Sequence, residues 1–379
     1  MALSTRRLLM LVLVACLLLT LGHAAGARAA SRARQPCLAD RTDGAMEPCP
    51  PVRPRAVILL QGVNSGLDTT AVPTGLEFTF HGPGSLVAYL QSNGWDTVPF
   101  LEYSYQGGAM QGDRWEPRPY SCEDTFTQSI RQAVDRLADQ VDAYLAAHPA
   151  TDLYLVGHSQ GGLIAFAYLA SLVTQDRTLA NQGRVAGVVT LDAPLGGLPL
   201  DQSTYRRVFE EGMTARCSAM EGKPFQNLGE LSAIWNHRAT DADTFAGSSQ
   251  SIAAGVFGSS PGDGPPVTNQ DVARDGVARS GTRVLTAGNA HDLLYANCQP
   301  AWHFGSTQWL ADGGAGSGIF ARAAASGAAC SLLPGSIHAS HAYLLADPNS
   351  HLTVRNFLEG HDPAPLGRAE DVAPCHHTC

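Results

Sequence analysis

The chain has 379 residues, of which 44% are hydrophobic and 16% are charged, and its formal net charge is −9. This length and apolar content suit a globular protein with a large core and argue against intrinsic disorder. An acidic chain without a basic stripe is poorly suited to nucleic acid, so we expect no nucleic-acid partner.

Residues 1–29 have the pattern of a cleaved export signal. Arg6 and Arg7 precede the apolar run 8–21, and residues 27–29 read Ala-Arg-Ala, a small-x-small cleavage site. The run is shorter than the roughly 18–20 residues of a spanning helix, which favours export over anchoring. We expect a secreted protein, extracellular or periplasmic. A twin-arginine signal and a lipoprotein anchored through Cys16 are the alternatives.

Eight cysteines follow this signal: Cys37, Cys49, Cys122, Cys217, Cys298, Cys330, Cys375 and Cys379. An even number of cysteines in an exported chain predicts disulfides, and the lack of a CxxC pair argues against thiol redox chemistry. Two local pairs are candidates, but the connectivity stays open: Cys37 with Cys49, and Cys298 with Cys330.

The first half of the chain predicts strands and helices in alternation. Residues 30–54 form a polar, proline-rich arm, and the continuous apolar run 55–60 is typical of a strand in a parallel sheet covered on both faces. A short helix is expected over 84–91 and a strand over 96–103. A loop with two Gly-rich turns follows over 106–120.

The middle of the chain continues this order. Apolar residues recur at helical spacing over 125–148 and predict a long amphipathic helix. A buried strand over 153–156, a helix to about residue 173 and a strand over 185–191 follow. Such an order implies a parallel α/β sheet with helices on both faces.

Residues 200–280 interrupt the alternation, because a helix-like start gives way to a Gly/Ser/Pro-rich segment. An insertion there suits a cap or lid over the carboxyl edge of the sheet, with a long disordered loop as the alternative. The sheet resumes at 282–286, and 349–359 predicts a closing helix. The main domain therefore spans 55–360, and 361–379 is a tail that contains Cys and His.

The strand before Ser159 leads into a short catalytic motif. Residues 157–161 read Gly-His-Ser-Gln-Gly, which fits G-x-S-x-G, and a helix follows at once. Strand, sharp turn and helix with serine at the apex form the nucleophile elbow of an α/β-hydrolase. Glycines are needed there so that strand and helix can pack closely. A second match around Ser260 lacks both the strand and the helix, and we reject it.

With this motif the chain resembles a secreted bacterial lipase or esterase of the α/β-hydrolase superfamily, in the triacylglycerol-lipase-like and GPI-inositol-deacylase-like group. The likeness covers roughly residues 55–200 and 282–359, and the elbow over 157–162 is a close match. Residues 189–197 resemble the family's T-P-H-x-G strand end, with alanine and leucine in place of the threonine and the histidine.

A serine hydroxyl needs a histidine to take its proton and a carboxylate to orient that histidine, and in this fold they follow in the order Ser, acid, His. Residues 341–348 are similar to the family's H-x-x-L-L-x-x-P ending, which implies His341 as the base, with His338 as the alternative. The family's acid follows a late strand, which favours Asp292. Asp192, after the preceding strand, is its rival.

The oxyanion hole of such enzymes uses the backbone N–H after the nucleophile, here Gln160, and one from the loop after the first strand. Lipases often have His-Gly-x in that loop, where this chain has Gln61-Gly62-Val63. The match implies Val63 as the second donor. The side-chain amide of Asn64 is a further candidate.

We expect no cofactor and no catalytic metal. His338 and His341, and the tail's Cys-His-His-Thr-Cys, contain ligand-type residues. They lack the H-E-x-x-H or paired CxxC spacing of zinc sites, and cysteines in exported proteins favour disulfides.

Together these features predict a secreted monomeric serine hydrolase that cleaves small-molecule or lipid esters. If the substrate is a lipid ester, the protein is expected to contact a lipid interface. An acyltransferase, thioesterase or polyester depolymerase would share the same residues, because fold does not determine substrate. A non-catalytic exported binding protein on a hydrolase shell is the alternative from another class.

Overall fold

The computed structural model describes residues 53–74, 80–174, 185–195, 197–198, 203–236, 256, 282–289, 308–309, 320–321, 341 and 343–361. All of them belong to one compact unit, Arg53–Cys379. The predicted signal, most of the arm, most of the Gly/Ser/Pro-rich part of the predicted insertion, Asp292, His338 and the tail after His361 lie outside these residues.

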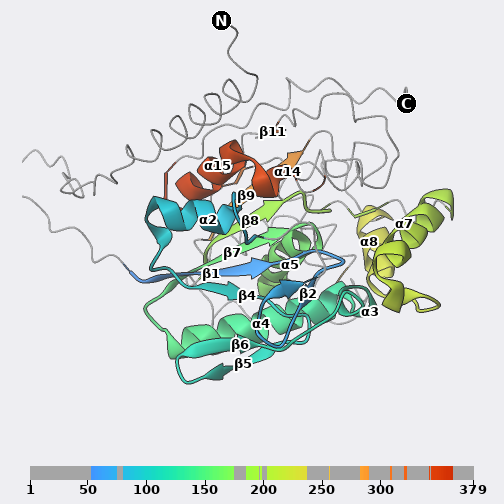
Figure 1. The fold of residues 1–379 in the computed structure, drawn as a ribbon, viewed down its shortest axis with the longest axis horizontal. Coiled ribbons are helices and arrows are strands. Elements are labelled where there is room, and N and C mark those ends of the chain that lie inside the picture. The colour runs from blue at the N-terminus through green and yellow to red at the C-terminus, as the bar shows by residue number, and fades with distance from the viewer. Residues whose placement is uncertain are drawn as a thin grey trace, which may run out of the picture. The chain divides into compact units, whose positions relative to one another are not determined.

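The central sheet consists of five parallel strands extended by short pieces at one edge (Figure 1). The parallel strands, in spatial order, are β9 (Arg283–Asn289), β8 (Val185–Leu191), β7 (Asp152–His158), β1 (Arg55–Leu60) and β4 (Phe100–Glu102). Along β9 lie β10 (Gln308–Trp309), which is antiparallel to it, and β11 (Phe320–Ala321), which is parallel. Since the five strands are parallel, their carboxyl ends meet at one edge, where such sheets bind ligands.

Helices cover both faces of the sheet (Figure 1). One face, named here the α4–α5 face, packs against α4 (Ile130–Ala147) and α5 (Gln160–Thr174). The other, the α15 face, packs against α2 (Leu86–Leu90), α14 (Tyr343–Ala346) and α15 (Pro348–Leu358). Alternate residues of β1 enter the two cores, since Ile58 lies in the first and Leu59 in the second.

The parallel α/β architecture is the one that the order of elements predicts. The strands over 55–60 and 185–191 have the predicted bounds, and the strand before Ser159 is longer than predicted, at Asp152–His158. Both α2 and β4 are shorter than the ranges expected from the sequence. A π-helical turn, η1 (Gln91–Trp95), follows α2.

The prediction of a loop over 106–120 is wrong, because this segment forms a hairpin. Strands β5 (Gly108–Gln111) and β6 (Arg114–Pro117) pair antiparallel. Gly112, with φ of 65°, and Asp113 make the two-residue connection, and a glycine in that conformation is what a tight hairpin turn requires. A second small antiparallel pair joins β2 (Gly66–Leu67) to β3 (Pro73–Thr74).

The long amphipathic helix begins at Ile130, later than predicted. Ser129 accepts a hydrogen bond from the backbone of Gln132, whose side chain bonds back to Ser129, and this capping box starts a new helix. The short helix α3 (Asp124–Thr127) is therefore separate from α4. The break leaves the hydroxyl and carbonyl of Thr125 available to the residues around Ser159.

The start of the predicted insertion is helical, as its sequence indicates. It contains α7 (Ser203–Arg216), the 3-10 turn η2 (Ser218–Met220) and α8 (Asn227–Asn236). A disulfide joins Cys217 to Cys122, 95 residues earlier, and ties α7 to the segment before α3. In the chain-entropy model, closing a loop of this length stabilises the fold by about 4–5 kcal/mol. The candidate pairs suggested above lie outside the described residues.

None of the helices in the described part of the chain is both long enough and apolar enough to cross a membrane.

Candidate active site

Ser159 lies at the turn between β7 and α5, as the motif predicts. Its φ is 56°, a left-handed conformation that costs a non-glycine residue free energy and that occurs at functional turns. The N–H of Ser159 donates to the carbonyl of Leu191 at 2.9 Å, and its own carbonyl accepts from the N–H of Gly162 at 3.0 Å. The serine is only 4% exposed.

The glycines around Ser159 are required by close backbone contacts. A Cβ on Gly157 would lie 2.5 Å from backbone atoms of Gly161, and one on Gly161 would lie 2.1 Å from the carbonyl oxygen of Leu60. Such separations are far inside van der Waals contact, so no other residue fits without movement of the backbone. The start of α5 is thus pressed against the ends of both β7 and β1.

The loop after β1 lies directly against Ser159. A Cβ on Gly62 would lie 2.6 Å from Cβ of Ser159 and 3.0 Å from its Oγ. The carbonyl of Gln61 accepts from the Tyr105 hydroxyl at 3.1 Å, and that of Gly62 accepts from the Ser65 hydroxyl at 2.7 Å. These bonds hold both carbonyl oxygens in fixed directions.

Asn64 fixes the far end of this loop. Its φ is 62°, and its N–H donates to Oγ1 of Thr125 at 3.1 Å. Its amide nitrogen donates to Sδ of Met213 on α7 at 3.3 Å. That contact engages the amide group that the sequence suggested as an extra oxyanion donor.

Val63 and Gln160 are the predicted oxyanion donors. Within the part of the chain that the structure describes, neither backbone N–H has a hydrogen-bond acceptor. The side chain of Gln160 is buried and donates to the carbonyl of Thr125 at 2.9 Å and to the Tyr105 hydroxyl at 3.3 Å, and it accepts from Asn227 at 2.6 Å. Tyr105 and Thr125 therefore hold both the loop after β1 and the elbow.

His341 lies beside the elbow and is buried. Nε2 of His158, the residue before Ser159, is 2.8 Å from the carbonyl oxygen of His341, and the two imidazole rings are 4.8 Å apart between centroids. Burial, and then the charge of a protonated His341, lower the pKa of His158 to about 3. His158 is therefore neutral at physiological pH. Sequence reasoning missed this contact, for which the only signal is an imidazole at the end of a buried strand.

Of the two candidate acids, Asp292 lies outside the described residues, whereas Asp192 lies at the end of β8. Asp192 is fully buried, has a φ of 46°, and donates its N–H to the carbonyl of Ala287 at 2.8 Å. It follows Leu191, whose carbonyl accepts the N–H of Ser159. The structure thus places a buried carboxyl-bearing residue next to the elbow.

Another ionisable pair lies at the same edge. Glu102 ends β4, two strands from β7, and its Oε1 is 2.5 Å from Nε2 of His81. The sequence interpretation did not identify this pair, although a glutamate that ends a buried strand was a signal for it.

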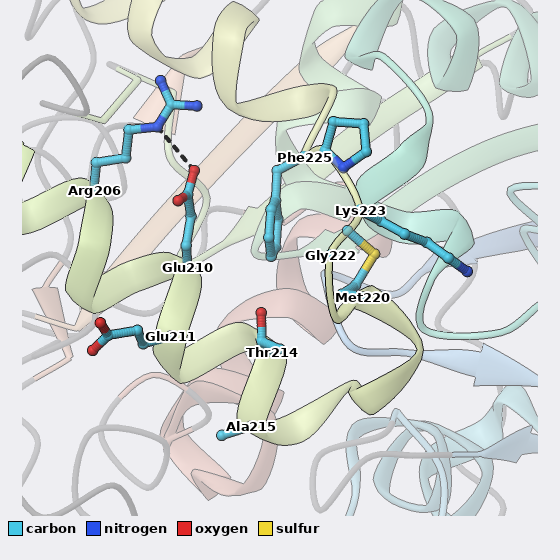
Figure 2. Close-up of a pocket in the computed structure, with 10 residues that line it drawn as sticks. Arg206, Glu210, Glu211, Thr214, Ala215, Met220, Gly222, Lys223 and Phe225 are labelled. Carbon is cyan, nitrogen blue, oxygen red and sulfur yellow. Dashed lines mark hydrogen bonds and ion pairs between the residues drawn. The ribbon is translucent and has the colours of Figure 1, made fainter.

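No group of three or more His, Cys, Asp or Glu suited to a metal ion occurs among the described residues. A groove of about 640 Å³ lies between α7 and the segment after η2 (Figure 2). Its wall includes the ion pair of Arg206 with Glu210, and Phe225. None of the predicted catalytic residues lines this groove.

Comparison with known protein families identifies the fold class. The profile of the alpha/beta hydrolase fold family matches residues 75–234, a range that contains the elbow. Together with the parallel sheet and the turn at Ser159, this match shows that the chain has the α/β-hydrolase fold. No curated protein matches the sequence.

Among solved structures, the chain is similar to a cutinase-like protein from Cryptococcus sp., with 16% identity, a TM-score of 0.24, and coverage of 39% of this chain and 57% of that one. It is similar to a phospholipase from Legionella pneumophila, with 9% identity, a TM-score of 0.35, and coverage of 65% and 42%. It is also similar to a carboxyl esterase from Bacillus coagulans, with 10% identity, a TM-score of 0.32, and coverage of 67% of this chain and 77% of that one. The chain thus spans less than two thirds of the first two proteins.

Proposed function

We propose that this protein is a secreted serine hydrolase that cleaves carboxylic esters through an acyl-enzyme on Ser159. The observation that carries the proposal is the left-handed Ser159 between β7 and α5, with Gly62 pressed against its side chain. A strained serine at such a turn is the arrangement that α/β-hydrolases use for nucleophilic attack. The disulfide between Cys122 and Cys217 accords with an oxidising compartment and so with export.

The reaction would begin as His341 takes the proton of Ser159 Oγ while that oxygen attacks the ester carbonyl carbon. The backbone N–H groups of Val63 and Gln160 would bind the oxyanion. Two observations support this role. Neither N–H group has a hydrogen-bond acceptor within the described residues, and Tyr105 holds both the loop and the elbow that carry them. His341 would then give the proton to the leaving alcohol. Water, activated by His341, would release the acid and restore Ser159.

The carboxylate that orients His341 is proposed to be Asp292, as the family resemblance implies. Asp192 is the competing candidate, because it is buried beside the elbow at the end of β8. The variants Asp292→Asn and Asp192→Asn distinguish them. Loss of the orienting carboxylate is expected to lower kcat by about 10⁴-fold, and the other variant should retain far more activity. A larger loss in Asp192→Asn would transfer the role to Asp192.

The first test is hydrolysis of p-nitrophenyl esters, from acetate to palmitate, by the oxidised mature protein and its Ser159→Ala variant. We expect activity in the wild type and a fall of about 10⁶-fold in the variant. The chain length with the highest kcat/KM separates a lipase from an esterase. The protein is proposed to act as a monomer, which light scattering of the active sample checks.

Other reaction classes become outcomes of this test. If the wild type is inert on every ester but a fluorophosphonate probe labels Ser159, a thioesterase, acyltransferase or polyester depolymerase replaces the ester hydrolase. If Ser159 is neither active nor labelled, the protein is a binding protein on a hydrolase shell, and the proposed function is wrong.

A further inference from the structure

Two buried histidines hold the segment that carries His341. His158 bonds through Nε2 to the carbonyl of His341, and His351, on α15, bonds through Nε2 to the carbonyl of Leu345, each at 2.8 Å. Because a carbonyl oxygen can only accept, Nε2 is the donor in both bonds. The segment is therefore held from β7 at one end and from α15 at the other.

The two histidines differ in what else they touch. The ring of His158 lies against the ring of His341, with 4.8 Å between centroids and 47° between planes. The ring of His351 packs instead against Tyr89, at 5.4 Å between centroids. His158 thus contacts both the backbone and the imidazole of His341, and it is the immediate neighbour of Ser159 in the chain.

We propose that His158 is a positioning residue for His341: its hydrogen bond and its ring contact set the placement of the His341 imidazole relative to Ser159. This inference rests on the proposed function, in which His341 moves the proton. One covalent neighbour of the nucleophile would then hold the base directly, so that β7 sets the geometry of both groups. Misplacement of a reacting group by about 1 Å can cost about 10²-fold in rate, which is why such a contact matters.

The protonation state of His158 supports this role. Burial and the neighbouring His341 lower the pKa of His158 to about 3, so the ring stays neutral with its proton on Nε2. A neutral neighbour lets His341 accept the proton of Ser159 without a second positive charge beside it. A lysine or arginine at position 158 would instead place a positive charge beside His341.

Three variants of the full-length oxidised protein separate positioning from structural support. His158→Phe keeps an aromatic ring but removes the donor, and His158→Gln keeps an N–H donor at similar reach but removes the ring. His351→Phe is the matched control, since it removes the same kind of bond to the same segment without touching the His341 ring.

We expect His158→Phe to lower kcat for p-nitrophenyl esters by about 10–100-fold with KM changed by less than about threefold. His158→Gln should recover part of that loss. His351→Phe should lower the thermal midpoint comparably but leave kcat within about threefold of the wild type. A kcat within about twofold of wild type in His158→Phe, or equal losses in His158→Phe and His351→Phe, would overturn the proposal.

A second measurement does not depend on hydrolysis. Carbethoxylation of His341 by diethyl pyrocarbonate, followed by peptide mass spectrometry, reports how firmly its imidazole is held. The rate should rise several-fold in His158→Phe and stay near the wild-type value in His351→Phe. If the wild type proves inert, the proposed function fails, yet this rate still decides the inference, because an unchanged rate in His158→Phe refutes it.

Discussion

At the carboxyl edge of the sheet, the two faces carry different kinds of polar group. On the α4–α5 face, Tyr105, Thr125, Gln160 and Asn227 bond to one another and to the loop after β1. None of these groups changes charge near neutral pH, and burial raises the pKa of Tyr105 further. These four residues form a frame on this face, and the hydrogen bonds among them do not depend on pH near neutrality.

On the α15 face, the groups next to Ser159 are ionisable histidines. His158 follows Val156 of that core on the same side of β7, and its ring meets His341, which belongs to the segment that leads into α14. Burial lowers the pKa of both His158 and His351. The comparison teaches that Ser159 and the loop after β1 are held by neutral groups from one face, whereas the proposed base, His341, is held from the other.

The largest expected effect concerns acid stability and belongs to the α15 face. The folded-state pKa of His158, about 3, lies below the ordinary value of 6.5. As pH falls below 6.5 the unfolded chain therefore binds more protons than the folded one, so this stability is complete above pH 6.5 and is lost progressively toward pH 3. At about 1.4 kcal/mol per pH unit the loss is at most about 5 kcal/mol.

Urea unfolding at pH 7, 5 and 4 measures this loss, and His158→Gln should show a flatter dependence of the free energy of unfolding on pH. Parallel curves for the variant and the wild type would place the acid sensitivity elsewhere and break the comparison.

The next prediction concerns the packing of the loop after β1 against Ser159. Gly62→Ala should lower kcat/KM by about 10²–10³-fold, because its Cβ would lie 2.6 Å from Cβ of Ser159 and displace this proposed nucleophile. Gly212→Ala is the control, since a Cβ there meets nothing within 4 Å. Ester hydrolysis and thermal melting measure both variants. An active Gly62→Ala would mean that the loop moves freely, contrary to a rigid frame.

A smaller effect is expected from the Tyr105 hydroxyl. Tyr105→Phe leaves the carbonyl of Gln61 without its donor and weakens the hold on Gln160, which should cost about 1–3 kcal/mol of stability and about tenfold in kcat. Tyr103→Phe is matched, because the Tyr103 hydroxyl donates to the carbonyl of Ala133 on α4, away from Ser159. It should cost stability but not kcat. Equal kcat values in the two variants would count against the frame.

The smallest effect concerns Gln61, which is 1% exposed and whose amide atoms have no partner among the residues that the structure describes. A buried amide without partners costs free energy, so Gln61→Met should raise stability by about 1 kcal/mol. Gln140→Met is the contrast, because Nε2 of Gln140 donates to the carbonyl of Glu102 at 3.2 Å. Gln140→Met should therefore lower the free energy of unfolding. Chemical denaturation measures both, and a destabilised Gln61→Met would contradict the prediction.

Much of the scaffold follows from local sequence. The strands at 55–60 and 185–191 are continuous apolar runs, and their burial on both faces needs no distant information. The turn at Ser159 also follows from local sequence, because G-x-S-x-G between a strand and a helix is enough to predict a sharp strand-to-helix turn. The hairpin at Gly108–Pro117 was missed because its residues lack the apolar alternation of a strand.

The sequence by itself determined the parallel α/β architecture and the turn that bears Ser159, because short apolar runs and adjacent glycines act over a few residues. Only the tertiary structure showed Gly62 against Ser159, His158 on His341, and the bond of Cys122 to Cys217. These contacts join residues up to 183 positions apart. They depend on which strand ends meet at one edge of the sheet, and no local pattern encodes that.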